Sequence, residues 1–314
     1  MDDFRHQPVL LQEVLALLNL HPGARVLDGT VGGAGHARAI LEATAPDGQL
    51  IGLDRDPRAV QQAREQLACF GARCRIEQAN FSDAGAVLCR EGWAGVDAML
   101  LDLGVSSHQL DSAGRGFSFR QEAPLDMRMD QSQGLTAAEL VNQADVEQLA
   151  QIFKKYGEER WARKIARRIE RVRQLQPIRT TTELATLVQE TVPGGLVPAR
   201  IHPATRVFQA LRIAVNEELA HLEIGLARAL NLLNPGAVLA VISFHSLEDR
   251  IVKNLFRAEA DPCVCPPRLP LCCCGKQKRV EILTRRGVRA SEQEIADNPR
   301  ARSAVLRAVR RLAV

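Results

Sequence analysis

Aromatic side chains are scarce in this sequence. They make up 4% of its 314 residues, with nine Phe, two Trp and one Tyr. A protein that recognises RNA by stacking many bases on aromatic rings needs more of them, so that mode of recognition is not indicated. A long apolar run is also missing, since none approaches the roughly 18 residues of a membrane span. The first ten residues, MDDFRHQPVL, are acidic and polar, unlike a secretory signal. We therefore expect a cytoplasmic protein with no membrane partner.

Positive charge is unevenly distributed along the chain. The formal net charge is only +4, yet the tail from Arg285 to Arg311 holds eight arginines. A second basic block falls within one short helical stretch and consists of Arg160, Arg163, Lys164, Arg167, Arg168, Arg171 and Arg173. Such blocks often contact nucleic acid, but a solvated helix face is an equally good interpretation of either block alone.

Cysteines are clustered in one segment. Five of the eight lie between residues 263 and 274, and the other three are scattered. In a cytosolic chain, clustered cysteines favour metal or redox chemistry over structural disulfides. Zinc sites more often use C-x₂₋₄-C than the C-x-C spacing found here. The sequence therefore leaves open a four-thiolate site or a reduced, proline-bent hairpin, and assigns no metal ligand. The four candidate ligands are Cys263, Cys265, Cys272 and Cys274.

A glycine-rich loop lies between a predicted strand and a predicted helix. Residues 24–36 read ARVLDGTVGGAGH, and the helical pattern ARAILEA follows. Glycines let the backbone approach a ligand closely, and the helix start presents free N–H groups. The dinucleotide fingerprint G-x-G-x-x-G is absent because its third glycine is missing. The pattern D-G-x-x-G-G-x-G resembles instead the cofactor loop of S-adenosylmethionine-dependent methyltransferases, although a purely structural loop is the alternative.

Further polar or aromatic residues follow three more predicted strands. Asp54, Phe81 and Asp102 come at the ends of the apolar segments that begin at residues 49, 74 and 96. Ligands of open α/β sheets bind beyond the carboxyl ends of strands, and an acid after the second strand suits ribose hydroxyls. Asp56 is the better candidate to cap the next helix, which leaves Asp54 for a ligand. Phe81 suits an adenine ring, and a position in the apolar core is the alternative.

The alternation of strands and helices stops after Ser107. Residues 108–134 form a long polar loop, and capping-box patterns at Thr136 and Thr180 then open helices. We expect an all-helical insertion over residues 110–205 that divides an α/β domain into residues 1–109 and 206–314. The second part is predicted to hold one long helix (202–233), strands at 237–246 and 279–284, and a basic terminal helix.

Seven motifs, in order, resemble one protein family over about 300 positions. They are LLDLGVSS (100–107), RGFSF (115–119), PLDMRMD (124–130), YGEER (156–160), HPATR–FQALRI–VN (202–216), ISFHSLEDRIVK (242–253) and NPRARSAVLR (298–307). The chain is similar to the bacterial 16S ribosomal RNA cytosine-N4 methyltransferases (the RsmH/MraW family). Several ordered motifs are far more specific than one.

The resemblance implies a Rossmann-like, class I methyltransferase sheet of seven strands with a helical domain inserted after the fourth. It implies S-adenosyl-L-methionine as cofactor and transfer to N4 of a cytidine in the decoding centre of 16S rRNA, with the free RNA or the small ribosomal subunit as partner. By motif, the cofactor contacts are Ala34, Gly35, His36, Asp54, Phe81, Asp102 and Gln109.

Asp102 is the residue that we expect to orient the cofactor or the amine. Amino-methyltransferases acting on DNA often carry D/N-P-P-Y/F here, whereas this chain has Asp102-Leu-Gly-Val and no aromatic to stack the base. Asn216, Ser243 and His245 are candidate substrate contacts, with a structural role equally open for His245.

Two other classes of function stay open from the sequence. One is a methyltransferase acting on another RNA, a protein or a small molecule, although a basic insertion does not suit a metabolite. The other is a non-catalytic RNA-binding protein for ribosome assembly. The sequence also leaves open whether the protein forms a homodimer.

Overall fold

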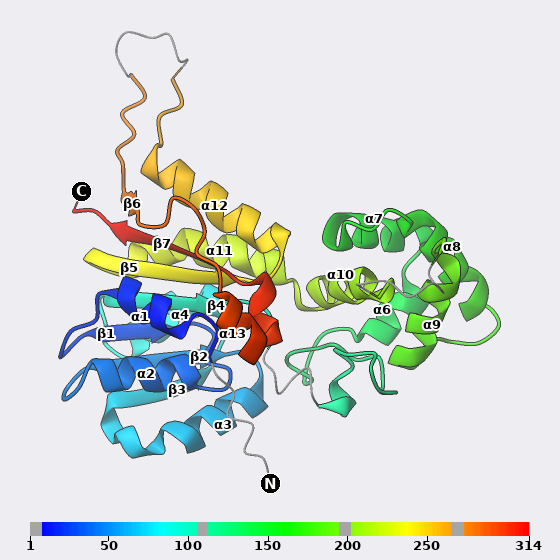
Figure 1. The fold of residues 1–314 in the computed structure, drawn as a ribbon, viewed down its shortest axis with the longest axis horizontal. Helices are drawn as coiled ribbons and strands as arrows, with labels where there is room; N and C mark the ends of the chain where they lie inside the picture. The colour runs from blue at the N-terminus through cyan, green and yellow to red at the C-terminus, as the bar shows by residue number, and fades with distance from the viewer. Residues whose placement is uncertain (1–7, 106–111, 195–201, 266–272, 314) are drawn as a thin grey trace. The chain divides into compact units, whose positions relative to one another are not determined.

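The computed structural model describes residues 8–105, 112–194, 202–265 and 273–313. The chain divides into two compact units, drawn in Figure 1. The sheet unit comprises Met1–Gly104 and Ala220–Val314, and the helical unit comprises Val105–Leu219. The predicted insertion at 110–205 falls within the helical unit, which also takes in the helix after residue 203.

The sheet unit is built on seven strands in the order β3-β2-β1-β4-β5-β7-β6. Strands β1 to β5 run parallel, whereas β7 lies antiparallel between β5 and β6. This order confirms the expected class I methyltransferase sheet. The strands are β1 (Arg25–Asp28), β2 (Gln49–Asp54), β3 (Cys74–Gln78), β4 (Val96–Asp102), β5 (Leu233–Ser243), β6 (Val280–Ile282) and β7 (Val305–Arg311).

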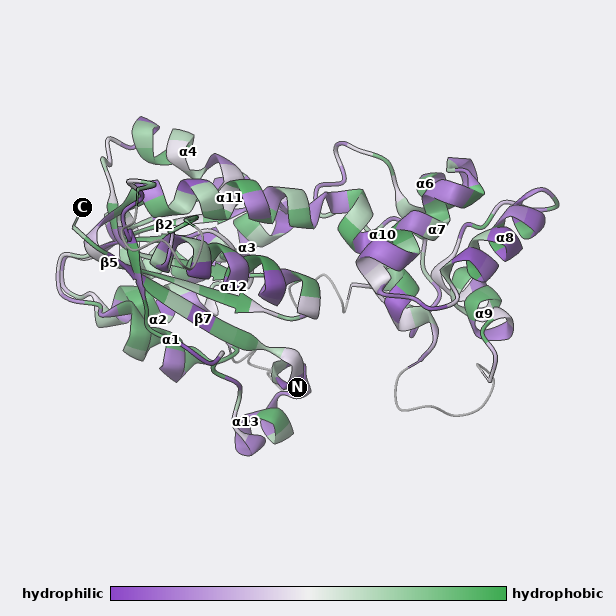
Figure 2. Cartoon of the chain, turned by 90° about the horizontal axis from the view of Figure 1, so that it is seen from above, coloured by the Kyte–Doolittle hydropathy of each residue, from purple (hydrophilic) through white to green (hydrophobic). Residues whose placement is uncertain are grey.

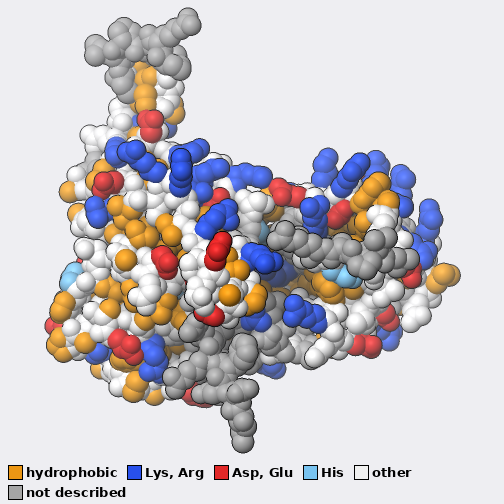
Figure 3. All heavy atoms as spheres, viewed as in Figure 1, with side chains coloured by type: hydrophobic (Ala, Val, Ile, Leu, Met, Phe, Trp, Pro, Cys, Tyr) orange, Lys and Arg blue, Asp and Glu red, His pale blue; other side chains and the backbone are white. Residues whose placement is uncertain are grey.

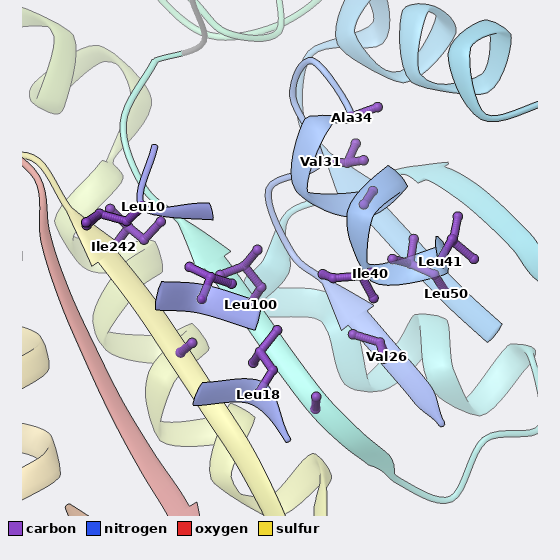
Figure 4. Close-up of a cluster of buried hydrophobic side chains, with 14 of the residues drawn as sticks. Leu10, Leu18, Val26, Val31, Ala34, Ile40, Leu41, Leu50, Leu100 and Ile242 are labelled. Carbon is purple, nitrogen blue, oxygen red and sulfur yellow. The ribbon is translucent and has the colours of Figure 1, made fainter. Parts of the chain in front are cut away.

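Helices cover both faces of this sheet. Alternate residues of each strand point to opposite faces, so neighbours such as Leu100 and Leu101 belong to different apolar clusters. One face packs on α1, α2 and α3, as Figure 4 shows in part, and the other packs on α4, α11 and α12. The strands are largely hydrophobic in Figure 2, as expected when both faces are covered. The helices of this unit are α1 (Leu11–Leu18), α2 (Gly35–Ala43), α3 (Pro57–Leu67), α4 (Ala84–Arg90), α11 (Glu218–Leu232), α12 (Ser246–Ala260) and α13 (Glu292–Asp297), with short turns η1 (Ala68–Arg73), η2 (Phe81–Asp83) and η4 (Pro299–Ser303).

The helical unit has a separate apolar core. The predicted capping boxes at Thr136 and Thr180 are both formed, each with a Glu three residues on. Part of the long polar loop joins the core, because Leu125, Met127 and Met129 are buried among the helices. Its helices are α6 (Ala137–Gln143), α7 (Val146–Gly157), α8 (Ala162–Arg173), α9 (Thr181–Thr191) and α10 (Ala204–Asn216), with the turn η3 (Ala113–Arg115).

Two predictions of secondary structure are wrong. The expected single helix over 202–233 is two helices, α10 and α11, because Glu217 adopts a left-handed conformation (φ 50°) that ends α10. The expected basic terminal helix is the short α13 followed by η4 and strand β7. Ser291 does cap a helix, but that helix ends at Asp297. In β7, Leu306 and Ala308 pack on one sheet face and Val309 on the other, which is the period of two of a strand.

None of the helices within the described ranges is both long and apolar enough to cross a membrane.

Candidate functional site

The carboxyl ends of four parallel strands bring the predicted ligand-binding residues to one edge of the sheet. Asp28 is in register with Leu100 of β4 and with Gly52 of β2. Asp54 and Asp102, which end β2 and β4, therefore lie on either side of the end of β1. This is the edge at which ligands bind in open α/β sheets.

The glycine loop after β1 is tied to both neighbouring strands through its backbone. Gly29 N donates to Leu100 O (2.9 Å), and Val31 N donates to Leu53 O (2.8 Å). Gly32 N donates to Asp54 Oδ2 (2.9 Å), so a side chain at the end of β2 holds the loop as well. The loop is therefore a fixed turn at the tip of β1.

Two glycines of the loop differ in what surrounds them. A Cβ added at Gly29 would lie 2.5 Å from Leu101 Cδ2 and 2.9 Å from Phe81 Cβ, so packing alone requires glycine there. A Cβ added at Gly33 would meet nothing within 4 Å, and Gly33 is exposed. Packing within the described chain does not explain this second glycine, whereas close approach of a ligand would.

The start of α2 carries the next predicted contacts. Ala34, at the position before the helix, is buried, has a left-handed backbone (φ 61°) and offers no side-chain cap. Gly35 lies against Pro8, whose Cγ is 2.4 Å from the position of an added Cβ. First-turn N–H groups without a side-chain cap suit an anionic or polar ligand group.

Asp102 is held at the tip of β4 by its backbone, while one of its carboxylate oxygens has no partner. Asp102 N donates to Thr30 Oγ1 (2.6 Å), which links β4 to the glycine loop. Oδ2 lies 3.5 Å from His36 Nδ1, and the side chain is 25% exposed. Oδ1 is buried and has no hydrogen-bond partner among the described residues. A buried, unsatisfied carboxylate oxygen is costly unless a ligand supplies the missing donor.

The carboxyls of Asp28, Asp54 and Asp102 form an acidic cluster at the strand ends, and burial raises the pKa of each. Burial raises the pKa of Asp28 to about 7, and the nearby Asp54 carboxylate adds to the effect. Burial likewise raises the pKa of Asp54 to about 6, against backbone hydrogen bonds from Asp56 and Gly32 that lower it. Burial raises the pKa of Asp102 well above its ordinary value, with Asp28 and Glu248 contributing repulsion. A cationic ligand at this edge would favour the ionised forms.

The remaining residues beyond β2 and β3 have mixed roles. Asp56 accepts from Arg58 N (3.0 Å) and caps α3, as expected, which leaves Asp54 to the loop. Phe81 is half-buried, and its ring lies against Gly225 of α11, where an added Cβ would be 2.5 Å away. Part of the Phe81 ring is therefore packed in the core, as the alternative interpretation expected.

The end of β5 carries Ser243 and His245. Ser243 is fully buried, and its Oγ has no hydrogen-bond partner in the described part of the chain. His245 caps α12, because its Nδ1 accepts from Glu248 N (3.4 Å), and its Nε2 lies 3.2 Å from Glu248 Oε1. The geometry of that second contact does not qualify as a hydrogen bond. His245 therefore has a clear structural role as a helix cap.

Asn216 has its contacts within the helical unit. Asn216 belongs to the helical unit, where its buried amide accepts from Met129 N (2.8 Å) and donates to Met127 O (2.8 Å). It holds the PLDMRMD segment against α10, a local role that the motif alone did not indicate. Gln109 lies outside the described residues.

Sequence reasoning missed two residues that shape this edge. Thr30 occupies an unspecified position of the loop pattern, yet its hydroxyl receives the Asp102 N–H. Val9 O lies 3.0 Å from His36 Nε2 and so orients the ring. Only a hydroxyl next to Gly29 in the loop hinted at the role of Thr30, and no sequence signal marks that of Val9.

The two basic blocks differ in the structure. On α8, the basic side chains that are exposed form one face, called the α8 basic face: Arg163, Lys164, Arg167, Arg168 and Arg171. Arg173 is instead structural, since its Nη1 donates to Val141 O and Ala144 O. Figure 3 shows many Lys and Arg side chains at the surface of this unit.

Part of the C-terminal block is committed to the fold. Arg307 pairs with Asp249 (2.6 Å), Arg310 pairs with Glu281 (3.0 Å), and Arg311 donates to backbone carbonyls before β5. Neither alternative given from the sequence, nucleic-acid contact or a solvated helix face, therefore describes all the arginines of this block.

Comparisons with known proteins identify the family. The model of the MraW methylase family matches residues 3–312. A ribosomal RNA small subunit methyltransferase H from Syntrophotalea carbinolica is 62% identical over 309 residues, covering 98% of each chain. A protein of the same name from Geobacter sulfurreducens is 58% identical, covering 98% of this chain and 99% of that one. Among solved structures, a SAM-dependent O-methyltransferase from Thermotoga maritima is 10% identical with a TM-score of 0.43, covering 100% of this chain and 70% of that one. The chain belongs to the MraW methylase family.

Proposed function

We propose that this methylase uses S-adenosyl-L-methionine to methylate the exocyclic N4 of one cytidine in the decoding centre of 16S rRNA. The ribosomal RNA substrate is supported by the names of relatives 62% and 58% identical to this chain. The N4 position and the decoding centre are supported by the ordered motifs quoted above. The observation that carries the proposal is the buried, unpartnered Oδ1 of Asp102 beside the glycine loop.

The residues at the strand ends fit such a cofactor. Its sulfonium group supplies a methyl group activated for transfer. A bound sulfonium cation would favour the ionised forms of Asp28, Asp54 and Asp102, whose raised pKa values leave them partly protonated without it. Both Asp54 oxygens accept backbone N–H groups, from Gly32 and Asp56, and each keeps a lone pair for a ribose hydroxyl. The space over Gly33 lets a ligand lie directly against the loop backbone.

Ala34, Gly35 and His36 would support the cofactor from the start of α2. Phe81 would offer the adenine the part of its half-buried ring that Gly225 and the apolar cluster of α4 and α11 do not cover. Gln109 is carried over from the motif alone. These assignments predict that variants at the strand ends weaken cofactor binding before they unfold the chain.

Asp102 would position the reacting amine or the cofactor. The lone pair of cytosine N4 is delocalised into the ring, so the amine is a weak nucleophile. A carboxylate that accepts an N4–H bond favours the pyramidal amine and can take up its proton. The orphan Oδ1 has this acceptor capacity. Ser243 and His245, at the end of the adjacent β5, remain candidate contacts for the base, and Asn216 remains one only through its motif.

The α8 basic face would bind RNA phosphates. Its five cations lie on one exposed helix face, and its ion pairs with acidic residues are long and exposed, such as Arg163–Glu147 at 3.6 Å and Arg168–Glu190 at 3.8 Å. Exposed pairs of this kind contribute little, so the face stays available to phosphate. Phosphate contacts would help to offset the few kcal/mol needed to unstack the target base.

The proposal is tested with labelled cofactor and small ribosomal subunits from cells that lack the protein. We expect methyl incorporation into one cytidine, mapped to N4 by mass spectrometry of nuclease digests, at a rate about 10²–10³-fold lower with the Asp102→Asn variant. Naked 16S rRNA in parallel distinguishes the assembled subunit from free RNA as substrate. Incorporation into another RNA would replace the substrate assignment. Tight cofactor binding without any incorporation would favour a non-catalytic assembly protein.

A further inference from the structure

Three cysteine thiols converge in a segment that the proposed function does not use. The Sγ atoms of Cys263, Cys265 and Cys274 all lie within 4.8 Å of one another. Cys273 adds a fourth thiol, with its Sγ 3.8 Å from that of Cys265. Two come from the arm that leaves α12 and two from the arm that returns to β6, so the cluster bridges residues at least eight positions apart.

The spacing of the sulfur atoms matches a metal site better than a disulfide. Tetrahedral zinc with Zn–S bonds of about 2.3 Å places its sulfur ligands about 3.8 Å apart. A disulfide requires about 2.0 Å, and the Cys265–Cys273 distance of 3.8 Å is far longer. The Cys265–Cys273 pair therefore has the separation of two zinc ligands, and the Sγ atoms of Cys263, Cys265 and Cys274, all within 4.8 Å of one another, are close enough to share one ion after a small shift.

The described parts of the two arms are exposed or only half-buried. None of the residues 261–265 and 273–279 is buried, so the two arms share no apolar core. The base of the hairpin is fastened, since Arg279 N donates to Glu259 O (3.0 Å) and its guanidinium pairs with Glu259 (3.3 Å). Small segments without a core are commonly ordered by a metal.

The cluster is remote from the strand-end site. Helix α12 begins at Ser246, beside the end of β5, and its 15 residues extend over about 22 Å before the cysteine arms start. Figure 1 shows these arms rising beyond the far end of α12 and the start of β6. A metal here would thus be structural and would not take part in methyl transfer.

We infer that Cys263, Cys265 and Cys274 bind one zinc ion as thiolates. Cys273 or a water molecule completes the tetrahedron, and Cys272 lies outside the described residues. Each coordinating thiol releases its proton to solvent as the Zn–S bond forms, so binding strengthens as pH rises. The ion fastens the two arms and fixes the backbone that carries the exposed Lys276 and Lys278.

Metal content tests this inference without any need for activity. Full-length protein is loaded with zinc chloride under reducing conditions, desalted, and analysed by inductively coupled plasma mass spectrometry. We expect about one zinc per chain, and at least a tenfold loss of zinc affinity in Cys263→Ser and in Cys274→Ser. The matched control is Cys69→Ser with Cys89→Ser, since both thiols are exposed and lie outside the cluster. Zinc in the wild type no higher than in the Cys263→Ser/Cys265→Ser/Cys274→Ser variant would overturn the inference.

Two measurements on the unmodified sequence guard against misfolded variants. Cobalt(II) in place of zinc is expected to give the intense thiolate-to-cobalt charge-transfer absorption of a tetrahedral site, and its absence would contradict the inference. Trypsin cleavage after Lys276 and Lys278 is expected to slow when chelator-stripped protein regains zinc, because a fixed segment fits a protease poorly. Equal cleavage rates with and without zinc, or a stoichiometric disulfide within the cluster in protein kept reduced, would also count against it.

Discussion

His36 faces Asp102 with the nitrogen that carries no proton in the neutral ring. His36 Nε2 lies 3.0 Å from Val9 O, and a carbonyl only accepts, so Nε2 carries the ring proton. Nδ1 then presents its lone pair to Asp102 Oδ2 at 3.5 Å. The lone pairs of His36 Nδ1 and Asp102 Oδ2 repel each other unless one proton lies between them. Burial acts in the same sense, because it raises the pKa of Asp102 well above its ordinary value.

Replacing Asp102 with Asn should separate binding from turnover. The amide keeps the shape of the side chain but loses the acceptor charge of the unpartnered Oδ1. At saturating cofactor, we expect turnover to fall by about 10²–10³, the usual loss when one aligned electrostatic contact is removed. Cofactor affinity is measured separately by calorimetry. Asp47→Asn is the matched control, because Asp47 is exposed at the opposite edge of the sheet.

The pH profile provides a second check on Asp102. If the ionised carboxylate is the active form, turnover rises with pH as Asp102 loses its proton, at a pH well above the ordinary range of an aspartate. This rising limb should be absent in Asp102→Asn. Near-normal turnover in that variant, or an unchanged limb, would show that the carboxylate has no such role.

The free energy of unfolding should fall as pH rises from 5 to 8 in the absence of ligand. Burial raises the pKa of Asp28 to about 7 and that of Asp54 to about 6, whereas the unfolded values are near 3.8. Between the unfolded and the folded pKa values, the folded state binds more protons than the unfolded state. The stabilisation that results is complete below about pH 4 and is lost as the pH passes 7. The total effect is on the order of a few kcal/mol. Urea unfolding at several pH values measures it.

Asp28→Asn should flatten this dependence, because the amide has no proton to lose. Asp47→Asn should leave the slope as in the wild type, since that carboxyl is exposed. A slope that is equal in all three proteins would mean that the buried carboxyls do not set the pH dependence.

Two glycine variants should separate packing from ligand contact. Gly29→Ala forces a methyl group to within 2.5 Å of Leu101 Cδ2, so we expect about 1–3 kcal/mol of destabilisation. Gly33→Ala has open space and should unfold like the wild type, yet bind the cofactor roughly tenfold more weakly, because a ligand pressed against the loop leaves no room for a methyl. Chemical denaturation and calorimetry provide the two readings. Wild-type cofactor affinity in Gly33→Ala would place the ligand elsewhere.

RNA binding should depend on salt through the α8 basic face. Each single-stranded phosphate contact contributes about 0.7 to the slope of log K against log salt. Lys164→Gln with Arg167→Gln should therefore reduce the slope by roughly 1.4. Arg307→Gln is a poor mimic of this change because Arg307 pairs with Asp249. Exposed Arg302 gives the better control, Arg302→Gln, and a slope equal to wild type in the double variant would remove α8 from the RNA surface.

The strand-end site could be predicted largely because its chemistry is local to each strand. Asp28, Asp54 and Asp102 each follow an apolar run, and parallel pairing brings such ends to one edge. Thr30 and Val9 could not be predicted, because their contacts with Asp102 and His36 depend on tertiary placement. The same holds for Asn216, whose amide holds Met127 and Met129 from 87 or more positions away.

The type of each secondary-structure element could be predicted where one hydrophobic period dominated, but the ends of elements could not. The apolar stripes of α10 and α11 merge into one helical pattern, and only the left-handed Glu217 divides them. The segment of β7 carries arginines and follows a good helix cap, so its pairing with β5 and β6 prevails over local propensity. Long-range strand pairing leaves little trace in a single sequence.

The position of the helical unit between β4 and β5 has a consequence for the growing chain on the ribosome. Asp102 ends β4 and Leu233 begins β5, so 131 positions must be translated before β4 gains its second neighbour. At about 5–20 residues per second, the apolar edge of β4 stays uncovered for on the order of ten seconds. During that interval the nascent half-sheet exposes apolar surface of the kind that chaperones bind, and β7, which completes the sheet, joins only after residues 305–311 have been translated.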